Sequence, residues 1–325
     1  MTGSKLQSDQ ALASIIIPCH NGERYVGEAI ESALTQTYPN IEVVVIDDGS
    51  TDDSLKVIRS FGNRVRWESG TNRGACAARN RGIELARGKL VQFLDADDLL
   101  FPEKIEMQVK HSASLDEQTV SICLGHPSKP DKFLEWQYAR LYEPSTDPVE
   151  FALGGILPTT APLHRRTLLR QVGGFDEVLP CAQEFDLHLR LVCSGVMLCQ
   201  LREVLFTVRR QSRSISSDGT KVIRQKRYIL DKARVVLESR REFTAARQQK
   251  MAIILAHAAT HLELFDDKNA AALCWRDAYS LSPDAAVLSW SPRWRPLVRL
   301  VGSANLARMR YNWRTVLSFV FCQRD

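Results

Sequence analysis

Short apolar strands alternate with amphipathic helical stretches through the first hundred residues, and this pattern constrains the fold more than any other feature of the chain. Residues 13–18 (ASIIIP), 41–46 (IEVVVI) and 90–94 (LVQFL) are nearly continuous apolar runs. Such runs are typical of parallel strands that are covered on both faces. The stretches 24–37 and 74–88 between them are predicted to be helical. This alternation predicts an α/β domain built on a mostly parallel sheet.

Composition narrows the class of protein further. The chain has 325 residues, of which 44% are hydrophobic and 25% charged, as in an ordinary globular protein. Its net charge of +5 is too small to indicate nucleic-acid binding. The chain begins without the apolar run of a signal peptide, and no stretch approaches the roughly 20 apolar residues of a membrane helix. Eight cysteines without paired metal-ligand spacing indicate free thiols in a reducing compartment, so we expect a cytoplasmic protein.

Polar or turn residues follow three of the predicted strands. The segments are Cys19–Gly22 (CHNG), Asp47–Ser50 (DDGS) and Asp95–Asp98 (DADD). In open α/β sheets, ligands bind in the crevice beyond the carboxyl ends of the strands. We therefore expect the three segments to form one composite site.

The acidic segment places three carboxylates, Asp95, Asp97 and Asp98, directly after an apolar strand. Like charges this close repel one another unless a cation neutralises them. Carboxylate oxygens suit Mg²⁺ or Mn²⁺, which proteins often share with substrate phosphates. An acidic turn that faces solvent is the alternative interpretation.

Three segments resemble family 2 glycosyltransferases of the GT-A fold, in particular the bacterial enzymes of polysaccharide synthesis. They are residues 14–54 (SIIIPCHNGERYVGEAIESALTQTYPNIEVVVIDDGSTDDS), 72–98 (NRGACAARNRGIELARGKLVQFLDADD) and 165–191 (RRTLLRQVGGFDEVLPCAQEFDLHLRL). The likeness extends over roughly residues 12–216. It implies a Rossmann-like mixed sheet and the transfer of a sugar from a nucleotide diphosphate, with inversion at the anomeric carbon.

The resemblance also implies a donor site at the first two strand ends. In this family pattern Pro18 shapes the wall beside the base, Glu23 approaches the ribose, and Asn21 belongs to the same turn. Asp48 would accept a hydrogen bond from the uracil imide if the donor is a UDP-sugar. The alternative is that Asp48 and its neighbours, including Ser50, cap the following helix.

The family pattern assigns the remaining donor-side residues to the metal and the diphosphate. Asp97 would coordinate Mn²⁺ or Mg²⁺, and Asp95 would contact the ribose or the metal shell. Arg79 also matches the pattern as a donor-binding residue. It could instead pair with the acidic residues.

An acidic pair followed by a short helix supplies the general base in the family, and its second residue removes the proton of the acceptor hydroxyl. Here the pair reads Gln183-Glu184, so the first acid is lost and the base is Glu184. The rival is Asp186, and residues two apart on a helix do not share a face. We favour Glu184, because a carboxylate with a longer arm keeps the same acid–base chemistry.

One further departure concerns a histidine that family members often carry near the diphosphate. Gln211 stands where that histidine would fall, within the segment VRRQSRSIS. Arg209, Arg210 and Arg213 would then meet the diphosphate or form a solvated basic loop. His20, His164 and His188 show no metal-ligand spacing and are interpreted as packing or surface residues.

We expect three regions: a disordered tail over residues 1–11, the catalytic domain over 12–220 and a helical extension over 221–325. Part of the extension resembles one tetratricopeptide-type hairpin, although a plain helical extension explains it equally well. The segment 290–314 is basic and interleaved with tryptophan. Such a segment can contact the inner face of a membrane or pack on its own domain.

The predicted function is therefore metal-dependent inverting glycosyl transfer from a nucleotide-sugar to a glycan or lipid-linked acceptor, without nucleic acid. Synthesis of a polysaccharide or glycoconjugate is the family's common use. A catalytically silent nucleotide-sugar-binding or scaffold protein is the alternative, because fold alone does not establish activity. No G-x-G-x-x-G follows the first strand, which argues against a dinucleotide-dependent oxidoreductase.

Overall fold

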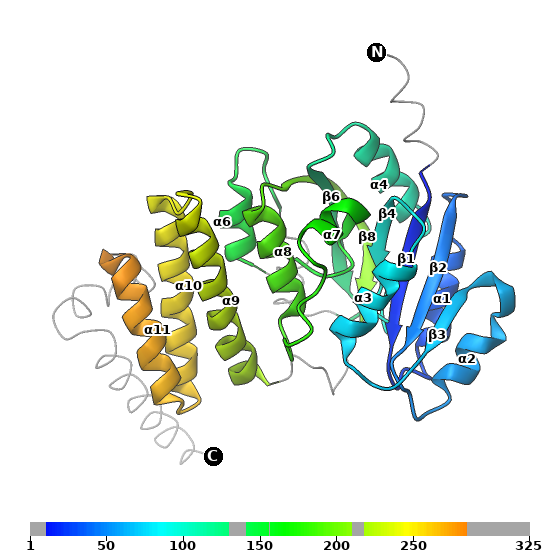
Figure 1. Cartoon of the computed structure of the whole chain (residues 1–325), viewed down its shortest axis with the longest axis horizontal. Coiled ribbons are helices and arrows are strands. Elements are labelled where there is room, and N and C mark those ends of the chain that lie inside the picture. The colour runs from blue at the N-terminus through cyan, green and yellow to red at the C-terminus, as the bar shows by residue number, and fades with distance from the viewer. Residues whose placement is uncertain (1–10, 130–140, 156, 210–217, 285–325) are drawn as a thin grey trace, which may run out of the picture. The chain divides into compact units, whose positions relative to one another are not determined.

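The structure is a computed structural model and describes residues 11–129, 141–155, 157–209 and 218–284. The chain divides into two compact units, Met1–Ile215 and Ser216–Asp325, which we call the N-terminal and the C-terminal unit. Figure 1 shows the strands in the first unit and a group of helices in the second. The sequence places this boundary at 220/221, five residues later.

One mixed sheet of eight strands organises the described part of the N-terminal unit, in the order β3-β2-β1-β4-β7-β6-β8-β5. The strands β3, β2, β1 and β4 are mutually parallel, whereas β7 runs antiparallel to both β4 and β6. In the other half of the sheet β6 and β8 are parallel, whereas β5 runs antiparallel to β8. The mixed sheet implied by the resemblance therefore describes the whole, with parallel pairing dominant among the first four strands. The strands are β1 (Ala13–Cys19), β2 (Ile41–Asp47), β3 (Arg66–Ser69), β4 (Leu90–Phe93), β5 (Leu99–Leu100), β6 (Thr119–Pro127), β7 (Pro162–Arg165) and β8 (Met197–Val208).

Helices cover both faces of the sheet, which explains why its central strands are apolar throughout. On β1, Ile15 and Ile17 pack into one core with α1, α2 and α4, whereas Ile16 packs into a second core with α3, α7 and α8. All three isoleucines are fully buried. The helices of this unit are α1 (Val26–Leu34), α2 (Ser54–Ser60), α3 (Ala75–Leu85), α4 (Lys104–Ala113), α6 (Pro148–Leu153), α7 (Arg166–Gln171) and α8 (Gln183–Cys193), with a 3₁₀ turn at Gly62–Arg64.

A buried polar network joins α4 to the sheet. The Lys104 side chain is completely buried, and its Nζ donates to Gln92 Oε1 at 2.5 Å and to Gln108 Oε1. The two amides continue to the carbonyls of Thr160 and Ala161, at 2.9 and 3.0 Å. Burial lowers the pKa of Lys104 to about 8. The network thus links α4, β4 and the segment before β7 through a lysine held in a low-dielectric core.

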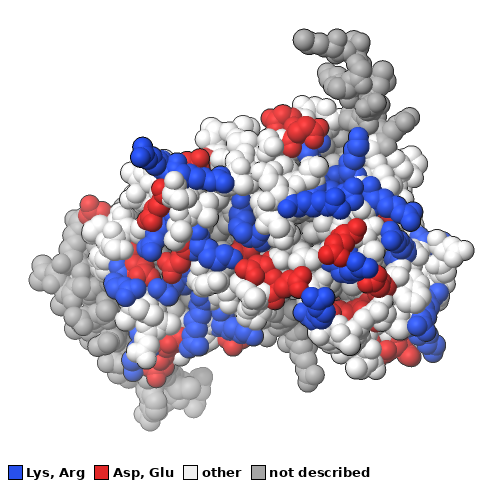
Figure 2. All heavy atoms as spheres, in the orientation of Figure 1, with Lys and Arg blue, Asp and Glu red and all other residues white. Residues whose placement is uncertain are grey.

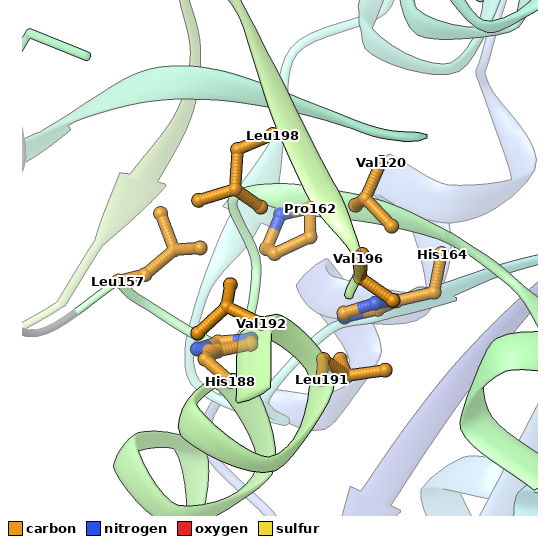
Figure 3. Close-up of a pocket in the computed structure, with 9 residues that line it drawn as sticks. All are labelled: Val120, Leu157, Pro162, His164, His188, Leu191, Val192, Val196 and Leu198. Atoms are coloured by element: carbon orange, nitrogen blue, oxygen red, sulfur yellow. The ribbon is translucent and has the colours of Figure 1, made fainter. Parts of the chain in front are cut away.

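Two buried imidazoles line a small pocket on the other face of the sheet (Figure 3). The rings of His164 and His188 stack with centroids 5.7 Å apart, and the pocket has a volume of about 10 Å³, near the minimum for one water molecule. No nitrogen of either ring has a hydrogen bond of good geometry with a described residue. The Leu157 backbone still lies close enough to His188 to oppose part of the lowering of its pKa by burial. Burial lowers the pKa of His188 to about 3 and that of His164 well below its usual value. Both are packing residues, as the sequence suggested.

Acidic and basic side chains alternate over much of the face in Figure 2, apart from a continuous band of Lys and Arg on the N-terminal unit. At the end of α3, the carbonyls of Leu85 and Ala86 accept hydrogen bonds from Arg66, which opens β3, and from Arg166, which opens α7. Lys89, just before β4, is exposed. This is the amino end of the parallel strands. The basic group therefore lies at the edge of the sheet opposite the predicted site.

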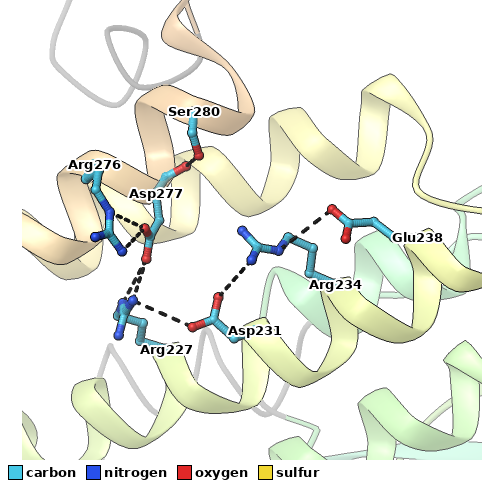
Figure 4. Close-up of polar contacts among 7 residues, drawn as sticks. All are labelled: Arg227, Asp231, Arg234, Glu238, Arg276, Asp277 and Ser280. Carbon is cyan, nitrogen blue, oxygen red and sulfur yellow. Dashed lines mark hydrogen bonds and ion pairs between the residues drawn. The ribbon is translucent and has the colours of Figure 1, made fainter.

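The C-terminal unit contains three described helices, α9 (Gly219–Ser239), α10 (Ala245–Leu264) and α11 (Lys268–Leu281). Asp277 of α11 accepts two hydrogen bonds from Arg227 of α9, at 2.6 and 2.9 Å, and two more from Arg276 (Figure 4). Nη2 of Arg227 also lies 3.6 Å from Oδ2 of Asp231. This ion-pair network ties the first helix of the unit to the third. The tetratricopeptide-type hairpin stays a prediction.

Among the helices that the structure describes, none combines the length and the apolar character needed to cross a bilayer. The predicted membrane contact at 290–314 lies outside the described residues, as do Arg210, Gln211 and Arg213.

Candidate active site

The ends of three parallel strands meet, as their polar residues predict. The backbone N–H of Asp48, which follows β2, donates to the carbonyl of Cys19 at the end of β1, at 2.8 Å. A side chain added at Gly22 would lie 3.6 Å from the Cβ of Ala96, in the turn after β4. The three loops therefore form one wall at the carboxyl edge of the sheet.

The turn after β1 is fixed to the loop after β2 by reciprocal hydrogen bonds. Asn21 adopts a left-handed conformation (φ 52°), and its Oδ1 accepts from the Thr51 N–H at 2.8 Å. Glu23 Oε2 accepts from the Asp53 N–H at 3.1 Å, and Asp52 accepts from the Glu23 N–H at the same distance. Asn21 and Glu23 thus order both loops. Pro18 lies just before them, buried in β1.

Asp48 is buried, and both its carboxylate oxygens accept backbone hydrogen bonds. The donors are the N–H groups of Arg73, at 2.7 Å, and Gly74, at 2.8 Å, immediately before α3. Asp48 therefore anchors the start of α3 and not α2. Ser50 does not cap α2 either, because its hydroxyl accepts from the Asn21 N–H. The alternative that Asp48 and Ser50 cap α2 is therefore not borne out, because the partners of Asp48 lie 25 residues away. A different residue of the loop, Asp52, accepts from the N–H of Ser54 at the start of α2, at 3.0 Å.

His20 is a site residue that the sequence reasoning assigned to packing or the surface. Its exposed ring has Nδ1 2.9 Å from the carbonyl oxygen of Asp48. The Asn72 amide lies 3.1 Å from Nε2. His20 therefore stands between the first two strand ends. Its place in the same four-residue turn as Asn21 was the available signal.

The acidic residues after β4 differ sharply in environment. Asp98 is buried and accepts from the Arg209 N–H at 3.0 Å. Burial, together with the charges of Asp95 and Asp97, raises the pKa of Asp98 well above its usual value. The short strand β5 pairs with the end of β8 and so brings Arg209 to this turn. Asp95 and Asp97 are only half-buried and face the site more openly.

Arg79 of α3 joins the acidic turn to α8. Its buried guanidinium donates through Nη2 to Asp95 Oδ1 at 2.6 Å and through Nη1 to Gln183 Oε1 at 2.9 Å. Its Cζ also lies 5.2 Å from the centroid of the Phe175 ring. The pairing with the acidic residues, which the sequence left open, is therefore present.

The two acids on α8 have different surroundings. Glu184 lies in the first turn, is half-buried and interacts electrostatically with Arg79. The Asp186 side chain is 1% exposed, and its Oδ2 lies 2.6 Å from Nη2 of Arg190. Arg190 in turn donates to the carbonyl of Gly174 at 2.8 Å. Asp186 thus braces a neighbouring loop, whereas Glu184 lies on the side of α8 next to Arg79.

That loop, which contains the VGGFDE segment, is also held by α3. The Asn80 amide accepts from the Phe175 N–H at 2.8 Å and donates to the Phe175 carbonyl at 2.9 Å. Gly174 has φ 69°, and a Cβ there would lie 2.4 Å from Asn80 Oδ1. Only glycine therefore fits this close approach.

The residues present suit a divalent ion only in part. No group of three or more His, Cys, Asp or Glu side chains in the described ranges is arranged to hold a metal by itself. Asp97 and Asp95 still provide hard oxygen atoms at the open edge of the site. Mg²⁺ is commonly bound by one or two carboxylates together with substrate phosphates. The two carboxylates thus fit an ion whose remaining coordination positions are filled by a diphosphate.

A family model described as glycosyl transferase family 2 matches residues 14–173. This range includes all three strand ends and stops just before the loop at Gly174. The N-terminal unit belongs to glycosyl transferase family 2. Gln183, Glu184 and the C-terminal unit lie beyond the matched range.

Curated relatives agree with this assignment over part of their length. An uncharacterized glycosyltransferase of Rickettsia felis is 36% identical over 190 residues, which are 56% of this chain and 31% of the relative. Chondroitin synthase of Escherichia coli is 42% identical over 99 residues, 30% of this chain and 14% of that enzyme. This chain thus spans less than two thirds of either relative.

Solved structures show the same fold at low sequence identity. TarS 1–349 of S. aureus in complex with UDP-GlcNAc superposes with a TM-score of 0.66 at 20% identity, covering 92% of this chain and 88% of that TarS fragment. The mannosyltransferase PcManGT of Pyrobaculum calidifontis, with GDP-Man and Mn²⁺, gives 0.55 at 16% identity, covering 93% and 87%. The N-terminal unit therefore has the GT-A fold.

Proposed function

We propose that this chain is a metal-dependent inverting glycosyltransferase that moves a sugar from a nucleotide-sugar, in first place a UDP-sugar, to an acceptor hydroxyl. The observation that carries the proposal is the link from Asp95 through Arg79 to the start of α8. It brings a cluster of acidic oxygens and a half-buried carboxylate, Glu184, into one site. These are the two kinds of group that the reaction needs.

Glu184 is the proposed general base. It removes the proton of the acceptor hydroxyl as the oxygen attacks the anomeric carbon, a role suited to a carboxylate near the site opening. Asp186 is the weaker candidate, because Arg190 and burial commit it to the neighbouring loop. Asp97, with Asp95 beside it, would hold Mn²⁺ or Mg²⁺. When bound, that ion stabilises the negative charge of the departing diphosphate.

Donor binding is assigned to the wall formed by the first two strand ends. Pro18, Asn21, Glu23 and Asp48 line or order that wall, and Asp48 is proposed to read the imide of uracil. Each Asp48 oxygen accepts one backbone N–H and retains a lone pair for a further donor. Because the structural relatives were solved with UDP-GlcNAc and with GDP-Man, both bases belong in the test.

The acceptor is proposed to be a glycan or a lipid-linked glycan in the synthesis of a polysaccharide or glycoconjugate. Support comes from the family and from the likeness to chondroitin synthase over the donor-side segment. That segment concerns the donor, so acceptor identity needs its own experiment.

The test is calorimetric binding and donor hydrolysis across UDP- and GDP-sugars, with Mn²⁺, with Mg²⁺ and with EDTA. We expect one donor class to bind only with metal, Asp97→Ala to lose that binding, and Glu184→Gln to bind but not turn over. Glu84→Gln, an exposed acid on α3, is the matched control and should behave as wild type. Binding without hydrolysis or transfer to any acceptor would instead favour the silent binder, and no metal-dependent binding would exclude the proposed site.

A further inference from the structure

Arg79 is the one described side chain that contacts the acidic turn, the start of α8 and the Phe175 loop at once. It is buried, and its Nε has no hydrogen-bond partner among the described residues. Arginine presents its donors in a rigid planar fork, so two fixed acceptors define its orientation. The fork therefore acts as a spacer between Asp95 and Gln183.

Gln183 is an uncharged acceptor at one end of the Arg79 guanidinium. Its Oε1 takes the Arg79 N–H at 2.9 Å, and its own Nε2 donates to the Leu179 carbonyl at 3.2 Å. The amide is buried. Because Gln183 carries no charge, the positive charge of Arg79 faces the carboxylates of Asp95 and, at longer range, Glu184. An acid at position 183 would compete for that charge and lie next to Glu184.

The backbone that leads into α8 is also unusual. Ala182, the residue before the helix, has φ 55° and ψ 34°, a left-handed conformation that residues with a Cβ seldom adopt. Such a conformation persists only where the surroundings enforce it. The Gln183 contacts on both sides provide that enforcement. The first turn of α8, which carries Glu184, is thus held in one orientation.

We propose that Arg79 and Gln183 form a positioning pair that sets the Glu184 carboxylate against the Asp95 end of the donor site. The inference rests on the proposed function of this site. It differs from a donor-binding role for Arg79, because neither member of the pair needs to touch the substrate. A shift of about 1 Å in a catalytic group can reduce the rate by about 100-fold.

The full-length chain is compared with Gln183→Met, Arg79→Lys, the double variant and Gln183→Glu. Arg81→Lys is the control, because Arg81 lies two positions away on α3 in an exposed pair with Glu68. We expect kcat to fall about 10- to 100-fold in Gln183→Met, with the donor Kd within about threefold of wild type. The double variant should be no slower than the slower single variant, since either change breaks the same link.

Gln183→Glu tests whether the side chain at 183 lies beside the base. A carboxylate beside Glu184 makes ionisation of the base less favourable, so the pKa that limits kcat on the acid side should rise by about one unit. Gln183→Met should lower kcat without that rise. An unchanged acid-side pKa in Gln183→Glu would show that the pair does not lie against the base and would overturn the proposal.

Two other results would also overturn it. One is a double variant whose fold-loss in kcat equals the product of the fold-losses of the two single variants. The other is a donor Kd that rises in Gln183→Met as much as kcat falls, which would make the pair a donor-binding element. If wild type binds no nucleotide-sugar, the proposed function fails, and urea unfolding of wild type, Gln183→Met, Arg79→Lys and the double variant then decides on the pair. Coupled losses of stability support the link between Arg79 and Gln183, and additive losses refute it.

Discussion

Asp186 and Arg190 form an ion pair one turn apart on α8, in which Asp186 is buried and Arg190 half-buried, with Arg190 Nη2 2.6 Å from Asp186 Oδ2. This ion pair distinguishes the two candidates for the general base, Glu184 and Asp186, which the sequence alone could only rank. Asp186 is part of the structural support for the Gly174 loop, whereas Glu184, two residues earlier, lies half-buried at the site.

The first prediction follows from this difference. Asp186→Asn should lower the free energy of unfolding by about 3 kcal/mol, because it leaves Arg190 without its carboxylate. Glu184→Gln should change it by less than about 0.5 kcal/mol while removing turnover. Urea unfolding and a donor-hydrolysis assay measure the two effects. Equal destabilisation by both variants would contradict the division of roles.

The stacked histidines predict a loss of stability in acid. His188 has its pKa lowered to about 3 in the folded protein, while in the unfolded chain it titrates near 6.5. Below pH 6.5 the unfolded state therefore binds the extra proton, and stability falls as pH falls toward 3. Between pH 7 and 5 this residue should account for a loss of about 2 kcal/mol.

His188→Leu should remove that part of the pH dependence. Urea unfolding at pH 7 and pH 5 measures it as the difference between the wild-type and variant slopes. Leu191→Val is the control, because it alters packing in the same pocket without altering titration. It should lower stability equally at both pH values. A His188→Leu slope identical to that of wild type would show that the ring does not remain neutral when buried.

The buried Lys104 predicts a pH dependence of stability in the alkaline range. Its folded pKa is about 8, and the unfolded lysine titrates near 10.4, so the unfolded state binds more protons between these values. The contribution of Lys104 to stability should therefore rise with pH in this window, by about 1 kcal/mol from pH 7.5 to 9. Four buried thiols, whose pKa values are raised by burial, act in the opposite sense once the unfolded thiols ionise near pH 8.5, so the Lys104 contribution is read as a difference between wild type and variant. They are Cys19, Cys76, Cys123 and Cys274.

The comparison is between wild type and Lys104→Met, measured by urea unfolding at pH 7.5 and pH 9. We expect the change in stability from pH 7.5 to pH 9 to be about 1 kcal/mol more favourable in wild type than in Lys104→Met. Lys110→Met, on an exposed part of the same helix, should show the wild-type change. A Lys104→Met protein with the wild-type change would place the cause elsewhere.

The ion-pair network of the C-terminal unit gives the fourth prediction. Asp277→Asn should lower stability by about 2 kcal/mol, because Asp277 is nearly buried between Arg227 and Arg276. Asp266→Asn, in the exposed pair with Lys268, should change it by less than about 0.5 kcal/mol. Thermal unfolding followed by circular dichroism tests both. An Asp277→Asn transition within error of the Asp266→Asn transition would refute the prediction.

The fold class follows from the sequence alone, and so does the meeting of the strand ends. Apolar strands alternating with helices require a sheet covered on both faces, and parallel strands bring their carboxyl ends to one edge. For this reason the sequence predicts that Asn21, Asp48 and Asp95 lie in one region. The acidic-pair position at Gln183-Glu184 is implied by the family resemblance and not by periodicity.

Only the tertiary structure decided which partner each of these side chains takes. Asp48 binds the start of α3 and not the helix that follows it, and Arg79 reaches Gln183 across 104 residues of sequence. Such contacts depend on how α3 and α8 pack on the sheet, which periodicity does not specify. The buried Lys104 network and the buried stack of His164 and His188 arise in the same way. Polar residues at these positions are stable only because distant segments surround them, so their roles appear only when the chain is folded.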